Sequence, residues 1–185
     1  IGVIGVAFNA KIMMTRALDD GGWGPDSSIA SAIIYAADNG ARVANISYAG
    51  VAGSSAIQSA ANYMKSKGGL VVVSAGNAGI SESIAPTTSM VVVSATDSAD
   101  NKTSWSSYGS FVTLSAPGAG IWSTNRGGAY GTWNGTSFSS PLTAGVAALL
   151  MATGIDGAQA EKLMNSTALD GGVILRSVAA RLLGS

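Results

Sequence analysis

Uninterrupted apolar runs alternate with amphipathic segments along the first half of the chain. Buried parallel strands are typical of such continuous β-branched runs. We predict four of them, over Lys11–Leu18, Arg42–Tyr48, Leu70–Ala75 and Met90–Ala95. Between the first three runs, Ser28–Asn39 and Ser54–Lys67 place apolar residues on one helical face, and glycines follow each segment. This alternation predicts an α/β fold with a mostly parallel sheet and helices on both faces.

The second half mixes Ser, Gly and aromatic residues before it becomes helical. We expect short strands at Phe111–Ser115 and Ile121–Thr124, with surface loops and a β-hairpin. A long apolar helix is predicted over Thr136–Met151 and a shorter amphipathic one over Asp156–Thr167. The tail contains Val173-Ile174-Leu175 and a final helical turn or two. No repeat or linker divides the 185 residues, so residues 1–185 are interpreted as a single domain.

Composition narrows the classes of function. Charged residues make up 11% and hydrophobic residues 47%, which indicates a packed chain rather than a disordered one. Ten basic residues balance ten acidic ones without clustering, so neither nucleic acid nor a membrane surface is an expected partner. The longest apolar run, within Leu142–Thr153, falls short of the roughly 20 residues that a membrane-spanning helix needs. The start at Ile1, without a signal peptide, is interpreted as a processed, cloned or partial sequence.

Two residue types are absent. Without Cys there are no disulfides or thiolate metal sites. Without His, the commonest general base and the commonest metal ligand are missing.

Ser137 stands at the start of the predicted long helix, in Asn134-Gly135-Thr136-Ser137. A helix N-terminus offers free N–H groups and positive potential to a developing oxyanion, so a nucleophile fits this position. From local sequence alone, helix capping by Thr136 or Ser137 is the favoured interpretation, because capping is the commonest role of such residues there. A phosphate-binding loop would need Lys after Gly135, and a nucleophile elbow would need Gly where Ser139 stands.

Asn77 follows the strand predicted over Leu70–Ala75, in Ser74-Ala75-Gly76-Asn77. Catalytic groups of open parallel sheets gather at the carboxyl ends of strands, and an Asn amide there could donate to an oxyanion. The alternative is that Gly76-Asn77 only makes a turn that ends the strand.

The two motifs together resemble the subtilisin-like serine peptidases. Gly135-Thr136-Ser137 with Pro141 and Ala144-Gly145 resembles their serine signature, and Val73–Asn77 resembles their oxyanion-asparagine segment. Further similarities run along the chain, at Gly5-Val6-Ala7 with Asn9-Ala10, Asn45–Tyr48, Trp105–Gly109 and Ser115–Gly118. The sedolisin group shares Gly-Thr-Ser but places Asp where this chain has Asn77, so the subtilisin-like family is favoured.

The resemblance implies roles for individual residues. Ser137 would be the nucleophile, and Asn77 with the Ser137 backbone N–H would form the oxyanion hole. An extended peptide would lie as an added strand between two edges. One edge is Gly22-Trp23-Gly24; the facing edge is Ser47-Tyr48-Ala49-Gly50, and the pocket wall is Ser74-Ala75-Gly76.

The sequence also departs from the family pattern. Ala49 stands where the family usually has Gly, which would narrow the pocket entrance, and Leu142 and Phe8 replace a common His and Pro. Trp23 is unusually large and either caps a subsite or packs on the surface. The resemblance also implies that the catalytic Asp and His lie before Ile1, so that the chain corresponds to the C-terminal two-thirds of a catalytic domain.

A partial domain of this kind has consequences that we state as expectations. The chain alone should show little or no peptidase turnover; a peptide-binding module that does not cleave, or a purely structural fragment, are the alternatives. In the family fold a strand lies between those matching Lys11–Leu18 and Arg42–Tyr48. Those two strands should pair directly, or a second copy should fill the gap. The resemblance suggests a secreted protein and allows calcium, although no calcium or other cofactor site is identifiable in the sequence.

Overall fold

In the computed structural model, which describes residues 3–168, four parallel strands form the central sheet. Their order is β1-β2-β3-β4: Val43–Ile46, Leu70–Ser74, Val91–Thr96 and Leu114–Pro117. Val43 of β1 lies opposite Leu70 of β2, and the pairing runs in register to Ile46 and Val73. Strands β2 and β3 are completely buried, which explains their unbroken apolar sequences. The predicted α/β class with a parallel sheet is confirmed.

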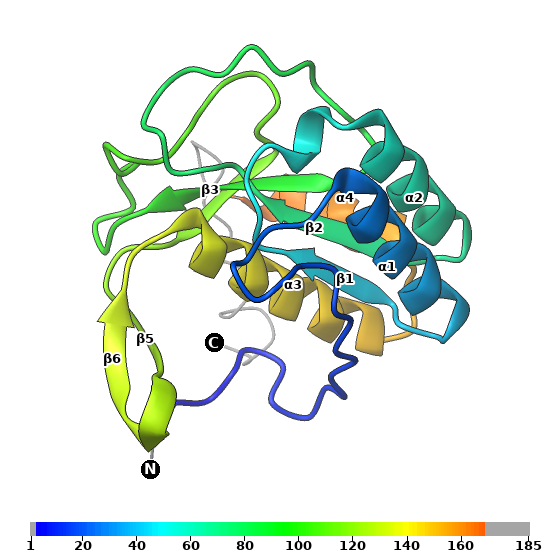
Figure 1. Ribbon diagram of the computed structural model, residues 1–185, viewed down its shortest axis with the longest axis horizontal. Helices are drawn as coiled ribbons and strands as arrows, with labels where there is room; N and C mark the ends of the chain where they lie inside the picture. The colour runs from blue at the N-terminus through cyan, green and yellow to red at the C-terminus, as the bar shows by residue number, and fades with distance from the viewer. Residues whose placement is uncertain (1–2, 169–185) are drawn as a thin grey trace.

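Helices cover both faces of this sheet (Figure 1). Helices α1 (Asp26–Asp38) and α2 (Ser55–Ser66) pack on one face, and α3 (Thr136–Ala152) and α4 (Gly157–Thr167) pack on the other. Because side chains alternate along a strand, Val71 and Val73 enter the first core while Leu70 and Val72 enter the second. The sequence therefore needs apolar residues at every position of β2.

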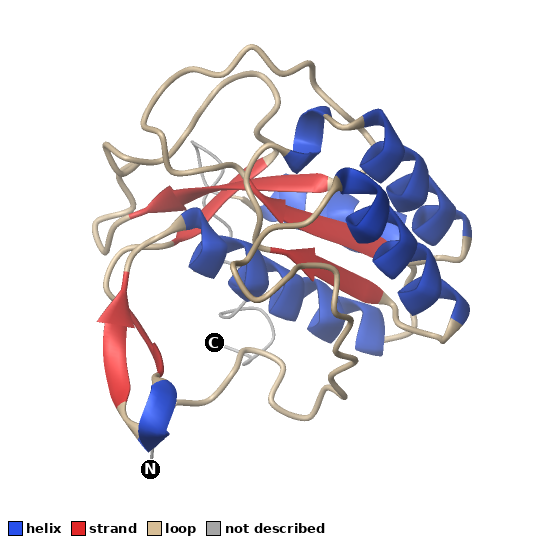
Figure 2. Cartoon of the chain, viewed as in Figure 1, coloured by secondary structure: helices blue, strands red, loops and turns tan. Residues whose placement is uncertain are grey.

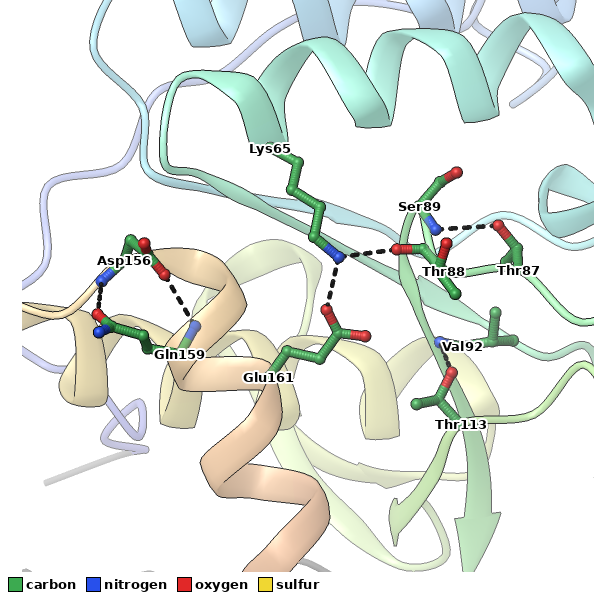
Figure 3. A network of polar contacts seen from close by, with 9 residues as sticks. All are labelled: Lys65, Thr87, Thr88, Ser89, Val92, Thr113, Asp156, Gln159 and Glu161. Atoms are coloured by element: carbon green, nitrogen blue, oxygen red, sulfur yellow. Dashed lines mark hydrogen bonds and ion pairs between the residues drawn. The ribbon is translucent and has the colours of Figure 1, made fainter.

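Polar side chains fix the helix ends and join the two layers. The Ser54 hydroxyl accepts a hydrogen bond from the Ile57 N–H at the start of α2. At α4, Asp156 and Gln159 form a reciprocal capping box with distances of 2.8 and 3.0 Å (Figure 3). Lys65 of α2 donates to Glu161 of α4 at 3.0 Å and to the Thr88 carbonyl at 2.8 Å (Figure 3). This contact connects helices from opposite faces of the sheet.

A small antiparallel hairpin stands apart from the sheet, beside the start of α3 (Figure 2). It consists of β5 (Ile121–Thr124) and β6 (Tyr130–Trp133). Two short 3₁₀ turns, η1 (Val51–Gly53) and η2 (Arg126–Gly128), complete the elements in residues 3–168. The predicted hairpin is confirmed, but its second strand was not anticipated.

The strand predicted over Lys11–Leu18 is wrong. These residues form no strand and none of the described backbone hydrogen bonds outside helices and strands involves them. A segment becomes a strand only if a neighbour accepts and donates its backbone hydrogen bonds. Instead, Ala17 and Leu18 pack against the core formed with α1 and α2, while Ile12 and Met14 remain 79% and 87% exposed. Direct pairing of this segment with β1, one of our two expectations for the gap, is therefore also wrong.

The strand expected at Phe111–Ser115 begins later than predicted. Residues 109–112 form a turn closed by a hydrogen bond from the Val112 N–H to the Gly109 carbonyl, and Phe111 reaches the core from this turn. Strand β4 then pairs in parallel with β3, so it belongs to the main sheet rather than to a hairpin. The remaining helix and strand predictions are confirmed within a few residues, and the predicted elements around Val173–Leu175 lie outside the described residues.

Within residues 3–168, no single helix combines the length and the apolar character needed to cross a membrane. Helices α3 and α4 pass that test only as a pair, which is bent by 118° at the break between them.

Candidate active site

The predicted site residues gather where the parallel strands end and α3 begins. Ser47 follows β1, Gly76 and Asn77 follow β2, and Ser137 lies in the first turn of α3. The Gly135 N–H donates to the Gly118 carbonyl beyond β4 at 2.8 Å, which fixes the entry of the chain into α3. Three strand ends and one helix N-terminus therefore meet at one place, as open parallel sheets allow.

Gly118 has to be a glycine for this approach. A Cβ placed on it would lie 2.6 Å from the Ala95 Cβ and 2.9 Å from the Gly135 carbonyl oxygen, inside normal contact distances. The missing side chain lets the segment that precedes Ser137 lie directly on the end of the sheet.

Thr136 fixes the orientation of the Asn77 amide. Its backbone N–H and its hydroxyl both donate to Asn77 Oδ1 at 2.9 Å, and the same hydroxyl accepts from the Gly76 N–H at 3.1 Å. Since Oδ1 is occupied by these two donors, the Nδ2 end of the amide remains available for another acceptor. A single point beside Gly135, its ideal Cβ position, lies 3.6 Å from both Asn77 Nδ2 and the Ser137 backbone nitrogen. Two nitrogen donors thus lie near one point at the start of α3, and two donors placed around one point can hold an anionic oxygen.

A second polar network connects β1 to the first turns of α3. The Ser140 hydroxyl donates to Asn45 Oδ1 at 2.6 Å, Asn45 Nδ2 donates to the Ser47 hydroxyl at 3.1 Å, and that hydroxyl donates to the Ser137 carbonyl at 2.9 Å. The network holds the predicted substrate edge at Ser47 against the helix that carries Ser137.

The capping interpretation of Thr136 and Ser137 is wrong. Gly135 occupies the N-cap position of α3 without a side-chain cap, and the Thr136 hydroxyl serves Asn77 instead. Ser137 is half-buried, and its hydroxyl has no hydrogen bond among residues 3–168. With no His anywhere in the chain, no imidazole can accept its proton.

The two predicted substrate edges meet through aromatic rings. Trp23, 74% exposed, lies edge-to-face on Tyr48 with ring centroids 6.3 Å apart, so the structure places its ring against the facing edge. The neighbouring Gly22, Ala49 and Gly50 are exposed, and Gly24 is half-buried. All three residues of the predicted pocket wall, Ser74, Ala75 and Gly76, are buried.

Sequence reasoning missed three contributors. Thr136 was considered only as a cap, and the Asn45–Ser140 pair was not anticipated. A polar Asn45 within the otherwise apolar run Val43–Ile46 was the available signal for that pair. Among residues 3–168, no group of three or more His, Cys, Asp or Glu side chains could hold a metal ion, so these side chains do not assemble a calcium site.

Comparison with known proteins identifies the family of this chain. The sequence model of the Subtilase family (peptidase S8) matches residues 1–179, and the chain belongs to that family. Thermitase from Thermoactinomyces vulgaris is 41% identical over 169 residues, which are 90% of this chain and 61% of thermitase. Subtilisin BL from Lederbergia lenta is 40% identical over 152 residues, covering 81% of this chain and 56% of the relative. The chain thus spans between 40% and 61% of the length of the curated relatives it matches.

Solved structures give the same result. A protease from Pseudoalteromonas arctica PAMC 21717 superposes with a TM-score of 0.85 at 29% identity, over 98% of this chain and 65% of that one. A cold-adapted subtilisin-like serine proteinase superposes with a TM-score of 0.77 at 34% identity, over 90% of this chain and 65% of that one. The family is therefore that of subtilisin-like serine endopeptidases, whose substrates are peptides.

Proposed function

We propose that this chain carries the nucleophile and the oxyanion hole of a subtilisin-like serine endopeptidase. Ser137 Oγ would attack the carbonyl carbon of the scissile peptide bond, and the resulting oxyanion would accept hydrogen bonds from Asn77 Nδ2 and the Ser137 N–H. The observation that carries this proposal is that Asn77 Nδ2 and the Ser137 backbone nitrogen each lie 3.6 Å from one point, the ideal Cβ position of Gly135. Family membership supports the same roles.

The proton of the Ser137 hydroxyl needs an acceptor. In acyl transfer the Oγ–C bond forms, the C–N bond breaks, and the hydroxyl proton passes through a general base to the leaving amine. The 185 residues contain no His to act as that base. We therefore propose that the base and its orienting carboxylate are supplied by residues outside this sequence, and that this chain alone turns over substrate negligibly. Extracellular action on extended peptides, as the resemblance implies, is part of the same proposal.

Adding a base from solution tests this assignment. A chromogenic peptide anilide should be hydrolysed no faster by the chain than by Ser137→Ala; Ser137-dependent turnover at ordinary enzyme rates would contradict the dependence on an external base. With an activated peptide ester and a high concentration of imidazole, the chain should exceed Ser137→Ala, and Asn77→Ala should reduce that excess. In subtilisin, to which this chain is related, losing one oxyanion donor costs about 10²–10³ in kcat. Equal ester rates for the chain and Ser137→Ala in imidazole would contradict the nucleophile role.

A peptide-binding module without cleavage is the second candidate. The unpartnered Ser137 hydroxyl and the lack of His favour it. Titration with a peptide aldehyde and the matching peptide amide separates the candidates, because only an activated Ser137 captures the aldehyde covalently. Saturable binding of both without capture, even in imidazole, would favour the binding module. No saturable binding at all would indicate a structural fragment.

We further propose that the free edge of β1 pairs with a strand of a second copy. In residues 3–168 the only neighbour of β1 is β2, and the nearby N-terminal segment exposes Ile4, Phe8, Ile12 and Met14. Unpaired strand edges and apolar surface both favour association.

A further inference from the structure

Glu82 lies beside the predicted pocket wall, in a loop that long-range contacts hold in place. Its backbone N–H donates to the Tyr108 carbonyl at 3.0 Å, and the Tyr108 N–H donates to the Ile80 carbonyl at 3.1 Å. The Ser107 N–H donates to the Gly76 carbonyl at 2.9 Å, so the same stretch is tied to the end of β2. Glu82 therefore has a fixed backbone position next to Gly76.

The Glu82 carboxylate faces the side of Gly76 on which a side chain would stand. A Cβ placed on Gly76 would lie 3.3 Å from Glu82 Oε1 and 3.1 Å from the Ser107 hydroxyl oxygen. Gly76 has a φ of +109°, which disfavours any residue with a side chain. The position thus leaves two oxygen atoms, one of them carrying negative charge, next to a bare stretch of backbone.

No basic group neutralises Glu82 within the part of the chain that the structure describes. Its carboxylate takes part in none of the ion pairs or side-chain hydrogen bonds there, although the residue is half-buried. Lys102 lies over the Tyr108 ring, but its ammonium group donates to the carbonyls of Thr103 and Ser106. The Glu82 carboxylate therefore has acceptor oxygens to offer to a cationic ligand.

We infer that Glu82 determines specificity by selecting arginine or lysine at the residue whose carbonyl Ser137 attacks. The inference rests on the proposed function, because that function places the attacked carbonyl between Asn77 Nδ2 and the Ser137 N–H. Gly76 directly precedes Asn77, and its N–H donates to Thr136, so the wall and the oxyanion hole form one rigid unit. The resemblance assigns Ser74-Ala75-Gly76 to the wall of the pocket for the attacked residue's side chain, which would bring that side chain along Gly76 toward Glu82.

The chemistry favours long cationic side chains over the alternatives. A guanidinium presents a planar fork of donors that matches a carboxylate, and an ammonium can reach the same oxygens as a point charge. An apolar side chain would leave the carboxylate unpaired, while an acidic one would be repelled by it. The preference for arginine or lysine therefore arises because a cationic side chain pairs with the Glu82 carboxylate, whereas an apolar side chain leaves it unpaired and an acidic one is repelled.

Binding of matched peptides tests the inference without requiring turnover. Three peptide amides would differ only at the residue whose carbonyl Ser137 would attack, which would be Arg, its neutral isostere citrulline, or Leu. NMR titration of the intact chain with each peptide would give the three Kd values. We expect the Arg peptide to bind about tenfold more tightly than the citrulline peptide, as one charge-assisted hydrogen-bonded pair provides. Glu82→Gln should abolish this ratio.

Glu161→Gln is the matched control. It removes the same charge from α4, where Glu161 pairs with Lys65 of α2 (Figure 3), and it should leave the ratio unchanged. Equal binding of the Arg and citrulline peptides, or loss of the ratio in Glu161→Gln as well as Glu82→Gln, would overturn the role of Glu82 while the proposed function stands. If none of the three peptides bound saturably, the peptide site itself would be contradicted.

Discussion

Thr136 and Asn77 are joined by two hydrogen bonds, one from the Thr136 backbone and one from its hydroxyl, and both end on Asn77 Oδ1 at 2.9 Å. The residue before the proposed nucleophile thus sets the direction of the proposed oxyanion donor. Thr136 is completely buried, so water cannot replace either bond.

Replacing the Thr136 hydroxyl should loosen this arrangement. Thr136→Val keeps the shape but leaves the Gly76 N–H without its acceptor, so we expect a loss of about 1–3 kcal/mol in the free energy of unfolding, measured with urea. The Asn77 side-chain amide resonances should also shift, because its Oδ1 loses one donor. Thr136→Ser should restore both readouts.

Thr153→Val provides the control at the other end of α3. There the hydroxyl donates to the Leu150 carbonyl from an exposed position, so its loss should cost much less. Equal losses for the two variants would show that the Thr136–Asn77 contact has no special energetic role.

The link between α2 and α4 predicts a second stability difference. The Lys65 and Glu161 side chains are 29% and 16% exposed, and Lys65 also donates to the Thr88 carbonyl. Lys65→Met should lower the free energy of unfolding by about 1–2 kcal/mol, because Glu161 and the carbonyl both lose a charged donor. Arg16→Gln breaks the ion pair between Arg16 and Asp20, whose side chains are 76% and 98% exposed, respectively. This variant should change the free energy of unfolding by no more than about 0.5 kcal/mol. A similar cost for both variants would contradict this ranking.

Asp38, Tyr63 and Lys67 should respond to pH as one surface cluster. The hydrogen bond from the Tyr63 hydroxyl lowers the pKa of Asp38, and Lys67 lowers it further. The contribution of Asp38 to stability is therefore complete above its unfolded-state pKa and is lost as pH falls through the folded-state value. The pKa of Lys67 is raised, chiefly by Tyr63 and then by Asp38, so its contribution is complete below its unfolded-state pKa of about 10.5 and is lost as pH rises through the folded-state value.

Tyr63→Phe tests this coupling directly. We expect the pKa of Asp38, followed by NMR titration, to move up toward the ordinary aspartate value, while Tyr35→Phe on α1 should leave it unchanged. An Asp38 pKa that is the same with and without the Tyr63 hydroxyl would contradict the assigned cause.

The sequence predicted most clearly the elements with a distinct apolar pattern. Strands β2 and β3 and helices α2 and α3 have apolar patterns that fit one environment only, and the structure confirms them. The apolar pattern of Lys11–Leu18 also predicts a strand, but these residues form none. Strand formation depends on a partner strand elsewhere in the chain, which the local sequence does not encode. Strand β6 was missed because Tyr130–Trp133 is short, exposed and interrupted by glycine.

The candidate site could be predicted from the sequence only in part. The proximity of the Asn77 and Ser137 segments followed from the family resemblance, and strand ends that meet at one edge of a sheet make it physically reasonable. The position of Glu82 did not follow from either argument. It depends on the pairing of residues 80–82 with Tyr108, a contact between two loops that carry no periodic pattern.

The open edge of β1 leads to a prediction about self-association. If a second copy pairs there, light scattering should show a concentration-dependent rise in mass, driven by the edge of β1 that has no strand partner in residues 3–168 and by the exposed apolar residues of the N-terminal segment. Ile12→Lys, at a side chain that is 79% exposed, should shift this equilibrium toward the monomer without changing the free energy of unfolding of the monomer. Leu163→Lys adds the same charge on α4, where Leu163 is 42% exposed, and should leave the mass unchanged. A monomer at all concentrations, or equal effects of the two lysines, would show that β1 does not pair with a second copy through this face.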